Sequence, residues 1–578
     1  MRLLPDLVKP IPLKRAVPSL PFAGQKKMPI LYCMSDTSTA PSNTYHLGLA
    51  MAGAVSAGAY TAGVLDYLFE TLERWEAEKI KGGVPTHNVV LDIMGGASAG
   101  GMCAAIAPLQ HLVDDKTDKE PLLKDLWINI AGKDADMFAE LLKTGDIEPG
   151  EGTISMLNAS CVDEIGKTIQ QRLYNTFQQQ KVPALPTYIS GKLEILLTLF
   201  NVSGLKFKLD IKSLWRKKQQ YAFEHRDLAH FKWSQIYTGD GRIPLWEDKD
   251  ALHTFVQAAK ATGAFPIGLS ARKVKRKIKH IRDNEFISGR VGDNLVFDGG
   301  PEQLTYESLN ADGGTANNEP LEYVQQVIKK LLEAEGATAQ GNSGVILIDP
   351  FPAFDKSIQS QTNHEKNLNS FAGKLIGAMR SQLLFDAKGM IAEYSDPGKS
   401  NFMIAPAKAD TEPDKALACG GLGGFSGFLY KDYRRHDYQL GRRNCQQFLR
   451  YYFVVMPGNT EPAAVVNGYA DPKTIERFGV RSGNKLYLPI IPDTFNCNVE
   501  ADKKTEEAYT YTLPDKKYLW SYKGQIRRRL RYVFRNLMPL NLGWKLLAYP
   551  LIEIAVLFLP GFILKKIYTD LKEIGVIR

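Results

Sequence analysis

The sequence has little cysteine, and its six cysteines are widely spaced, with no C-x-x-C pair. This spacing argues against a zinc site and a disulfide framework, and it suits a reducing compartment. The stretch from Met1 to Thr44 lacks the continuous apolar core of a signal peptide, so it is not expected to direct secretion. We therefore expect a cytoplasmic protein that begins with an N-terminal extension, residues 1–44.

No group of histidines and cysteines has the spacing of metal ligands, so neither a metal nor another cofactor is expected. The chain has 578 residues, of which 44% are apolar and 23% are charged, as in folded globular proteins. This length allows several domains, or one large enzyme domain with additions. We expect no nucleic-acid partner, and nothing in the sequence indicates the oligomeric state.

An apolar run followed by a glycine-rich turn lies at residues 89–107. The run Val89–Met94 predicts a buried strand, and the alanine-rich residues 102–107 predict a helix. Gly96-Ala97-Ser98-Ala99-Gly100 between them has the G-x-S-x-G form of a nucleophile elbow, in which a serine stands on a sharp strand-to-helix turn. The alternative is a glycine-rich turn with an incidental serine. The flanking strand and helix favour Ser98 as a nucleophile, with the elbow glycines Gly96 and Gly100 beside it.

A second strand, loop and helix precede this elbow. Tyr45–Met51 predicts a buried strand, residues 52–58 form a loop of small residues, and a helix is expected over 59–79. A loop of small residues leaves backbone N–H groups free to face an anion. The resulting β-α-β-α order predicts a parallel sheet covered by helices on both faces.

The small-residue loop, the sequence A-Y-T-A-G-V-L that follows it and the serine elbow resemble the patatin-like phospholipases in a bacterial version. The resemblance implies a three-layer α/β/α core with a mostly parallel sheet, and a Ser–Asp dyad that uses neither histidine nor metal. It implies that Ser98 and Asp312 are catalytic, with Asp312 in a D-G-G motif that includes Gly313 and Gly314. It also implies an oxyanion hole made by the amide groups of Gly53, Ala54, Val55 and Ala99.

Further stretches carry the same resemblance. Leu193–Phe200 and Gly344–Asp349 are expected strands, and Ala258–Pro266 is similar to a small-residue segment of the family that ends in Phe-Pro. Residues 420–453 also resemble bacterial relatives, but no chemical role can be assigned to them. We expect a catalytic core at 45–355, an accessory region packed on it at 356–522, and C-terminal additions.

The chain departs from the family in the loop, which is usually G-G-G-x-R-G. Gly53, Ala54 and Val55 stand where the three glycines belong, and Ala57 replaces the basic residue. Alanine and valine can still donate backbone hydrogen bonds, provided that the local backbone avoids positive φ, which both residues disfavour. The geometry of the oxyanion hole therefore depends on the backbone conformation of Ala54 and Val55.

Two D-G-G sequences compete for the role of base. Asp298 follows the apolar triplet Leu295–Phe297, which predicts a strand, whereas Asp312 precedes Asn317-Asn318 and a helical pattern that extends to Leu332. Asparagine at a helix start can cap free N–H groups and fix the loop that carries the aspartate. The family motif favours Asp312, and Asp298 remains the alternative, otherwise a turn aspartate.

A Ser–Asp–His triad is the rival mechanism. It would combine Ser98 with Asp312 or Asp349 and with His436, the best-placed late histidine. The neighbours Arg434, Arg435 and Asp437 are more typical of a surface or ion-paired histidine, and Asp349 is interpreted as structural.

The tail, residues 523–578, carries eleven Lys and Arg against three acids, a net charge of +8. Its apolar part, residues 540–564, is interrupted by Pro550, Glu553 and Pro560, which disfavours a membrane span. A basic cluster beside an apolar segment suits an interfacial anchor on anionic lipid, and the alternative is a helical hairpin packed on the core. The other basic stretch, Arg272–Arg282, predicts a strand with one solvated face.

These features predict a serine lipid acyl hydrolase that cleaves (lyso)phospholipids and is peripherally associated with the membrane. Two alternatives stay open. One is a membrane-bound scaffold that kept the fold but lost activity through the altered loop. The other is a soluble esterase or transacylase that uses the same dyad or the rival triad.

Overall fold

The computed structural model describes residues 43–112, 121–147, 153, 155–179, 182–209, 220–297, 304–336, 341–352, 401–408, 411–412, 415–457, 462–495, 511–537 and 542–578. Almost all of the expected N-terminal extension lies outside these residues, and so does the alternative base Asp298.

The central sheet runs in the order β5-β4-β3-β2-β1-β8-β9. Its strands are β1 (Thr44–Met51), β2 (Asn88–Gly96), β3 (Ile189–Leu209), β4 (Gln220–Lys232), β5 (Ile243–Pro244), β8 (Ser343–Ile348) and β9 (Asn401–Ile404). The pairs around β1 are all parallel, whereas β3 and β4 are antiparallel. Off this path, β7 (Thr305–Asp312) pairs antiparallel with β3 and with β6 (Arg272–Lys277). The expected mixed α/β fold with a mostly parallel sheet is confirmed.

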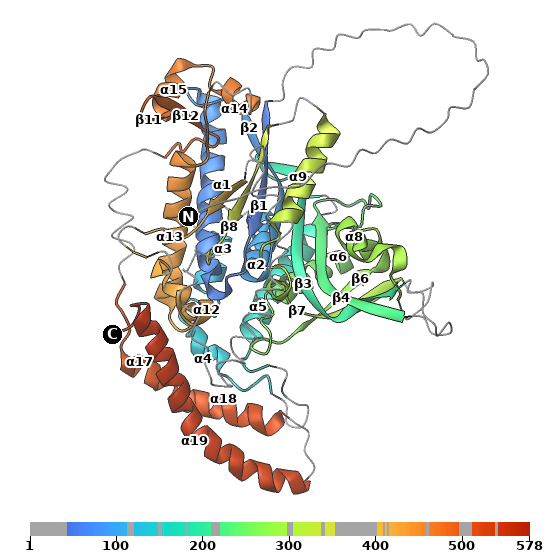
Figure 1. Ribbon diagram of the computed structural model, residues 1–578, viewed down its shortest axis with the longest axis vertical. Coiled ribbons are helices and arrows are strands. Elements are labelled where there is room, and N and C mark those ends of the chain that lie inside the picture. Colours follow the sequence, from blue (N-terminus) through green and yellow to red (C-terminus); the bar gives the residue numbers. More distant parts are fainter. Residues whose placement is uncertain are drawn as a thin grey trace, which may run out of the picture. The chain divides into compact units, whose positions relative to one another are not determined.

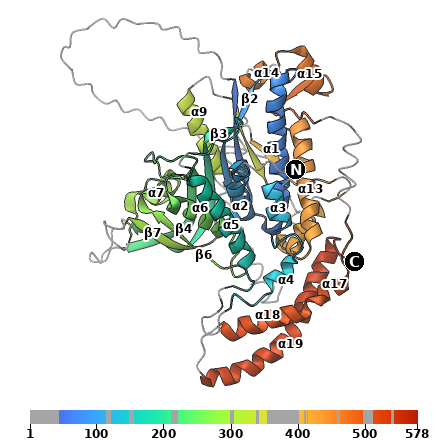
Figure 2. The ribbon, with the colours of Figure 1, turned by 180° about the vertical axis from the view of Figure 1, so that it is seen from behind.

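Helices cover both faces of the sheet (Figures 1 and 2). Helix α9 (Leu321–Glu335) packs on β1, β2 and β8, while α1 (Gly58–Lys81), α2 (Ser98–Ile106), α6 (Lys249–Thr262) and α13 (Lys431–Tyr451) belong to the layer on the other face. The remaining helices of the first half are α3 (Leu122–Ile128), α4 (Met137–Leu141), α5 (Ser160–Phe177), α7 (Ile278–Arg282) and α8 (Glu285–Val291).

The sequence of β1 explains how one strand packs against helices on both faces of the sheet. Alternate residues point to opposite faces of a strand, and Tyr45, Leu47, Leu49 and Met51 all enter the hydrophobic core shared with α1, α2 and α13. Ala50 faces α9 instead, within a second apolar core. Because both faces are buried, the strand reads as a nearly continuous apolar run.

Helices α1 and α13 lie side by side along the core (Figure 1). A Cβ on Gly63 would lie 1.9 Å from the Tyr438 carbonyl oxygen, and one on Gly441 would lie 2.2 Å from the Tyr60 carbonyl oxygen. Only glycine permits this approach at either position. Residues 420–453 thus supply a helix of the layered core, and β9 adds a strand to the sheet from beyond residue 355.

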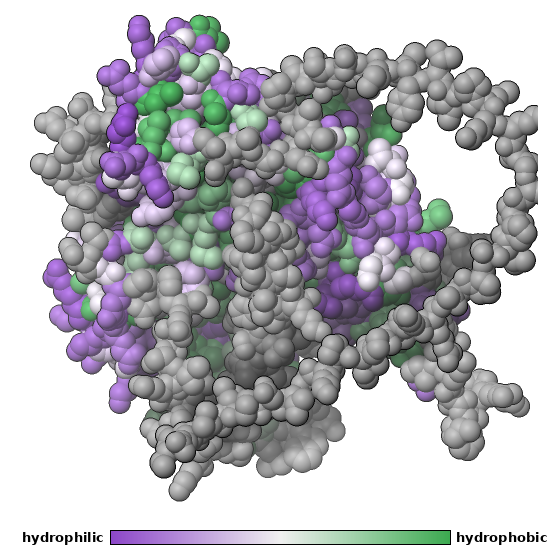
Figure 3. All heavy atoms as spheres, turned by 45° about the horizontal axis from the view of Figure 1, so that its top comes forward, coloured by the Kyte–Doolittle hydropathy of each residue, from purple (hydrophilic) through white to green (hydrophobic). Residues whose placement is uncertain are grey.

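A three-stranded sheet follows α13, in the order β10-β12-β11. It consists of β10 (Val454–Val455), β11 (Val480–Ser482) and β12 (Lys485–Pro489), and α14 (Ala463–Gly468) and α15 (Pro472–Phe478) accompany it. On the face of the molecule seen in Figure 3, hydrophilic and apolar side chains form separate patches.

Two sequence predictions on local structure are wrong. The strand expected over Arg272–Arg282 ends at Lys277, and α7 follows, because Ile278 and Ile281 are buried with helical spacing. The triplet Leu295–Phe297 forms no strand: Leu295 makes one isolated bridge to Phe207.

The tail forms α17 (Lys516–Ser521), α18 (Lys523–Asn536) and α19 (Leu542–Glu573), and α18 and α19 lie side by side (Figures 1 and 2). Helix α19 continues through Pro550 and Pro560, so these prolines do not interrupt it. Across the described part of the chain, no helix is both long and apolar enough to cross a bilayer.

Several tail arginines are already paired with acids. Arg529 is buried and makes a two-pronged ion pair with Asp146, while Arg531 and Arg535 bind Glu553 across the two helices. Part of the Arg-rich cluster therefore joins α18 to α19 and to the core.

Candidate active site

Ser98 stands at the turn from β2 to α2 with φ of +51°, in the left-handed region. Non-glycine residues are uncommon there, and such strain is typical of a nucleophile elbow. Close packing requires the elbow glycines: a Cβ on Gly96 would lie 2.5 Å from the Gly100 carbonyl, and one on Gly100 would lie 2.4 Å from the Met51 carbonyl oxygen. The local sequence therefore lets the chain turn sharply enough to present the serine.

The register of the sheet brings Asp312 to this turn. Gly96 of β2 pairs with Leu197 of β3, so Ser98 and Leu199, each two residues further on, lie at the same level. Leu199 pairs in turn with Asp312, the last residue of the antiparallel strand β7. Two strands of opposite direction thus end at one point beside β3.

The two side chains make a short hydrogen bond. The Ser98 hydroxyl donates to Asp312 Oδ2 over 2.6 Å, and the Gly314 N–H donates to Asp312 Oδ1 over 2.7 Å. Both Ser98 and Asp312 are buried, with 7% and 5% of their surface exposed. Asp312 is the partner of the Ser98 hydroxyl in the part of the chain that the structure describes. A carboxylate in this position can accept the hydroxyl proton.

The D-G-G glycines have no room for a side chain. A Cβ on Gly313 would lie 2.0 Å from the Thr198 carbonyl oxygen, and one on Gly314 would lie 2.7 Å from Asn318 Oδ1. Glycine at both positions therefore lets the turn after β7 pack directly on β3.

Thr262 is a site residue that the sequence did not single out. It ends α6, and its hydroxyl oxygen accepts a hydrogen bond from the Ser98 N–H over 3.0 Å. The Ala264 carbonyl accepts the Asp312 N–H over 2.9 Å. The segment Ala258–Pro266, noted in the sequence for its resemblance alone, thus forms a hydrogen bond with Ser98 and another with Asp312.

The expected oxyanion loop differs from the expectation in two respects. Val55 has φ of +50°, where a β-branched residue is strained, so the condition that the backbone avoid positive φ is not met at this residue. The Gly53 N–H is not free, because it donates to the Asn318 carbonyl over 3.2 Å. Ala54 keeps a negative φ of −143°. For the amides of Ala54, Val55 and Ala99, no acceptor is found among the residues described.

Gly53 is nevertheless fixed by sterics. A Cβ there would lie 2.9 Å from Ser98 Cβ and 2.3 Å from Asn318 Oδ1. The loop therefore packs directly against the serine, and it can do so only with glycine at this position.

Asn317 and Asn318 do not cap α9, which begins after Pro320. Asn317 Oδ1 instead accepts the Glu319 N–H over 3.2 Å, and Asn318 joins the two glycine turns through its carbonyl and side chain. The two asparagines therefore fix the loop after Asp312, as predicted, but they do so by hydrogen bonds and contacts within turns and not by capping a helix.

The other candidate acids and the histidine lie in different surroundings. Asp349 is buried after β8, accepts the Phe351 N–H over 2.8 Å, and burial raises its pKa to about 6. Burial, with the Asp349 charge nearby, raises the pKa of Glu319 to about 7. His436 is buried on α13, and its Nδ1 lies 2.8 Å from Asp437 Oδ1. The structure therefore brings neither Asp349 nor His436 to the Ser98 hydroxyl.

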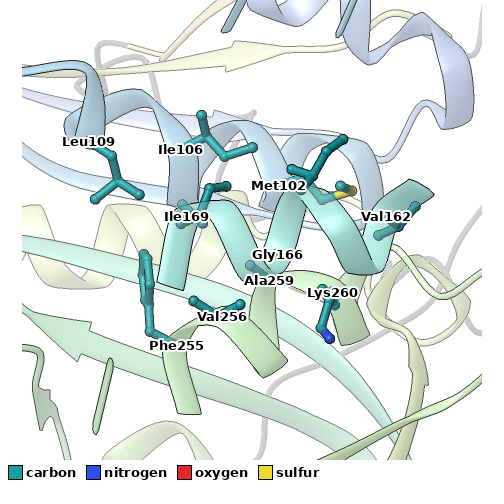
Figure 4. Close-up of a pocket in the computed structure, with 12 residues that line it drawn as sticks. Met102, Ile106, Leu109, Val162, Gly166, Ile169, Phe255, Val256, Ala259 and Lys260 are labelled. Atoms are coloured by element: carbon teal, nitrogen blue, oxygen red, sulfur yellow. The ribbon is translucent and has the colours of Figure 1, made fainter. Parts of the chain in front are cut away.

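An apolar cavity of about 30 Å³ lies between α2, α5 and α6 (Figure 4). On α2 its lining begins at Met102, one helical turn after Ser98, and on α6 it includes Ala259, three residues before Thr262. The cavity is thus lined by the two helices that carry Ser98 and Thr262. No group of three or more His, Cys, Asp or Glu that could hold a metal ion occurs within the described ranges.

Residues 49–324 match the family model of the patatin-like phospholipases. The chain is similar to "Uncharacterized protein y4iI" of Sinorhizobium fredii (strain NBRC 101917 / NGR234), with 27% identity over 511 residues that cover 78% of this chain and 70% of the relative. Among solved structures, VipD from Legionella pneumophila aligns over 89% of this chain and 88% of its own, with 12% identity and a TM-score of 0.22, which is too low to support a structural argument.

Proposed function

We propose that the chain is a serine lipid acyl hydrolase, because residues 49–324 match the family model of the patatin-like phospholipases, which supports a hydrolase. The observation that carries this proposal is the hydrogen bond of 2.6 Å between the Ser98 hydroxyl and Asp312 at a strained elbow. The proposed substrates are acyl esters of membrane phospholipids or lysophospholipids.

In the proposed reaction, Ser98 Oγ attacks the ester carbonyl carbon while Asp312 takes the hydroxyl proton. The carbonyl oxygen becomes an oxyanion, which the amide groups of Ala54, Val55 and Ala99 stabilise. The C–O bond of the ester then breaks, and Asp312 gives its proton to the leaving alcohol. An acyl-enzyme remains. Water, deprotonated by Asp312, attacks the carbonyl carbon of this acyl-enzyme. The bond between that carbon and Ser98 Oγ breaks, Asp312 returns the proton to Ser98 Oγ, and the fatty acid leaves.

The apolar cavity is evidence that the enzyme binds the acyl chain of its substrate. Its lining is almost entirely aliphatic and aromatic, and Lys260 is the charged residue on it. At about 30 Å³ it holds little more than one methylene group, so a longer chain must displace a side chain on entry. Met102 is the lining residue of α2 nearest to Ser98 in sequence, and methionine adapts readily to such a change.

The C-terminal tail supports the proposal that the enzyme acts at a membrane surface. Leu551, Ile554, Phe558 and Phe562 follow one another at helical spacing on α19, and between 55% and 74% of each side chain is exposed. The exposed residues Lys565 and Lys566 continue this stripe. An apolar stripe flanked by lysines complements an anionic bilayer, into which the helix can sink its apolar side. We propose a cytoplasmic enzyme that binds peripherally to such membranes.

The test is covalent labelling by a fluorophosphonate probe, beside hydrolysis of a phospholipid panel. The wild type should be labelled at Ser98 and release fatty acid, while Ser98→Ala should lose both activities and stay folded. A wild-type protein that neither reacts with the probe nor hydrolyses any lipid would favour the membrane-bound scaffold, which the strained Val55 also supports.

A further inference from the structure

The turn Ala54–Ser56 is hydrogen-bonded to a loop that lies about 370 residues further along the chain. The Ser56 hydroxyl is completely buried and donates to the Gly424 carbonyl. The same hydroxyl oxygen accepts the Gly427 N–H over 3.0 Å. Both hydrogen-bonding roles of this side chain are thus directed at one partner, the loop of residues 418–428, which we name the buttress loop.

The buttress loop is itself held in place by charged side chains of α13. Asp437 accepts the N–H groups of Ala418 and Cys419 over 2.8 and 2.9 Å. Arg434 is buried, donates to the Gly427 carbonyl, and also binds the carbonyls of Trp127 and Ile128 on the far side. Charge-assisted hydrogen bonds of this kind are the stronger ones, so the loop can serve as a fixed support.

The shape of the loop fits this contact. Leu422, Gly423 and Gly424 have φ angles of +56°, +64° and +96°. A Cβ on Gly424 would lie 3.2 Å from the Ala54 carbonyl oxygen, and one on Gly427 would lie 2.5 Å from Ser56 Oγ. The backbone of the loop is therefore seated directly on the turn.

The turn needs such a support, because Val55 occupies a left-handed conformation that its branched side chain disfavours. A strained conformation persists only where its surroundings determine it. The bond between the Ala57 N–H and the Ala54 carbonyl closes the turn, and Ser56 is its link to the buttress loop.

We infer that Ser56 is a positioning residue for the reaction. Through Ser56, the buttress loop holds Val55 in the strained turn, so that the amides of Ala54 and Val55 point to where the oxyanion forms. This inference rests on the proposed hydrolase function. It gives a role to residues 418–428, which the sequence leaves without one.

The buttress loop also reaches the C-terminal helix. The Leu422 N–H donates to Asp570 Oδ2 on α19 over 2.6 Å, and a Cβ on Gly421 would lie about 3 Å from Leu571 and Ile574. The end of α19 thus belongs to the support of the turn.

The test is a double-mutant cycle between Ser56→Ala and Val55→Gly, with an ester substrate. Ser56→Ala removes both bonds to the loop, and it should lower kcat by about ten- to a hundredfold with KM changed less than about twofold, because only transition-state contacts are lost. Glycine takes positive φ without strain, so adding Val55→Gly to the Ser56→Ala variant should restore at least about tenfold of the lost kcat.

Thr71→Ala is the matched control, since the Thr71 hydroxyl is also completely buried and donates to a backbone carbonyl, that of Tyr67. It should lower the unfolding temperature as Ser56→Ala does, with kcat unchanged. Should Ser56→Ala fail to fold, Ser426→Ala, which loosens the loop at the Ala418 carbonyl, should show a smaller loss of kcat with the same rescue. Wild-type kcat in Ser56→Ala, or a loss that Val55→Gly does not recover, would overturn the inference. An inactive wild type would instead overturn the proposed function.

Discussion

Ser98 and Asp312 are 214 positions apart in the chain, and a hydrogen bond of 2.6 Å joins their side chains. The bond exists because β3 pairs with two strands of opposite direction. Gly96 of β2 lies opposite Leu197, and Asp312 of β7 lies opposite Leu199. A shift of one residue in either register would turn one of the two side chains to the other face of the sheet.

The first prediction separates the acid at the end of β7 from the acid after β8. Asp312→Asn should lower kcat by about a thousandfold or more, since the amide keeps the shape but cannot take the proton from Ser98. Asp349→Asn should retain most of the activity, because Asp349 binds the Phe351 amide instead. The measurement is steady-state hydrolysis of a short-chain ester by both variants.

His436→Ala belongs to the same comparison. Its partner Asp437 holds the buttress loop, so some loss of stability is expected, and activity should be measured well below the unfolding temperature. A loss as large as that of Asp312→Asn would restore the Ser–Asp–His triad.

Much of this site could be predicted from the sequence, because its parts are local. A serine between small residues, after an apolar strand and before a helix, can hardly be anything but a turn of this kind. Gly96 of the elbow is required by a contact with Gly100, and Gly314 of the D-G-G motif by a contact with Asn318, each four residues further along the chain. The alternating faces of β1 likewise follow from a pattern of period two.

The remaining features depend on contacts between distant segments, which no local pattern records. Thr262 has no motif of its own, and its role comes from the packing of α6 on α2. The clasp between Ser56 and Gly424 needs the position of α13, which is set by the reciprocal glycine contacts with α1. In the tail, charge alone could not reveal which arginines are bound: Arg529 is neutralised by Asp146, far from it in sequence.

A second prediction concerns the cavity beside α2. Ala259→Leu adds three carbon atoms to its wall, so long acyl chains should be excluded while short ones still reach Ser98. The ratio of laurate to butyrate ester hydrolysis should fall by about tenfold or more. The same substitution at Ala77, on the exposed side of α1, is the control. An equal loss on both esters would show that the acyl chain lies elsewhere.

A third prediction concerns pH. Burial raises the pKa of Glu319 from its usual 4.5 to about 7, so between these values the folded protein holds a proton that the unfolded chain has released. Stability therefore falls as pH rises through this window. Glu319→Gln cannot ionise, and at pH 8 it should increase the free energy of unfolding by on the order of 2 kcal/mol, less than the full shift because the side chain is partly exposed. Urea unfolding at pH 5 and pH 8 measures the effect, which should shrink at the lower pH. An equal gain in the free energy of unfolding at pH 5 and pH 8 would show that the effect comes from packing and not from the ionisation of Glu319.

The last prediction concerns the stripe on α19 and decides what holds the protein on a membrane. Phe558 and Phe562 are 74% and 70% exposed, so replacing both by serine should hardly change the unfolding temperature. Each phenylalanine that enters the bilayer contributes about 1.5–3 kcal/mol, and the double variant should therefore bind vesicles at least about a hundredfold more weakly.

Lys565 and Lys566, which follow the stripe, provide the electrostatic part of the membrane binding. Lys565→Gln with Lys566→Gln should weaken binding by about 1 kcal/mol per charge, and this loss should fade as salt rises, since surface charges are screened within a Debye length. The loss in the phenylalanine variant should persist at high salt, because burial of apolar surface does not depend on screening.

The matched control is Arg531→Gln with Arg535→Gln, which removes two positive charges that already pair with Glu553. Because these charges hold the hairpin together, the control should lower the unfolding temperature while changing vesicle binding less than the lysine pair does. Co-sedimentation with vesicles of phosphatidylserine and phosphatidylcholine at two salt concentrations measures binding, and turnover of a short-chain ester measures the site. The phenylalanine variant should keep that turnover, since Ser98 and Asp312 do not touch the stripe. If it instead binds vesicles as the wild type does, the exposed face of α19 is not the membrane contact, and the tail serves only to pack on the core and support the turn through Asp570.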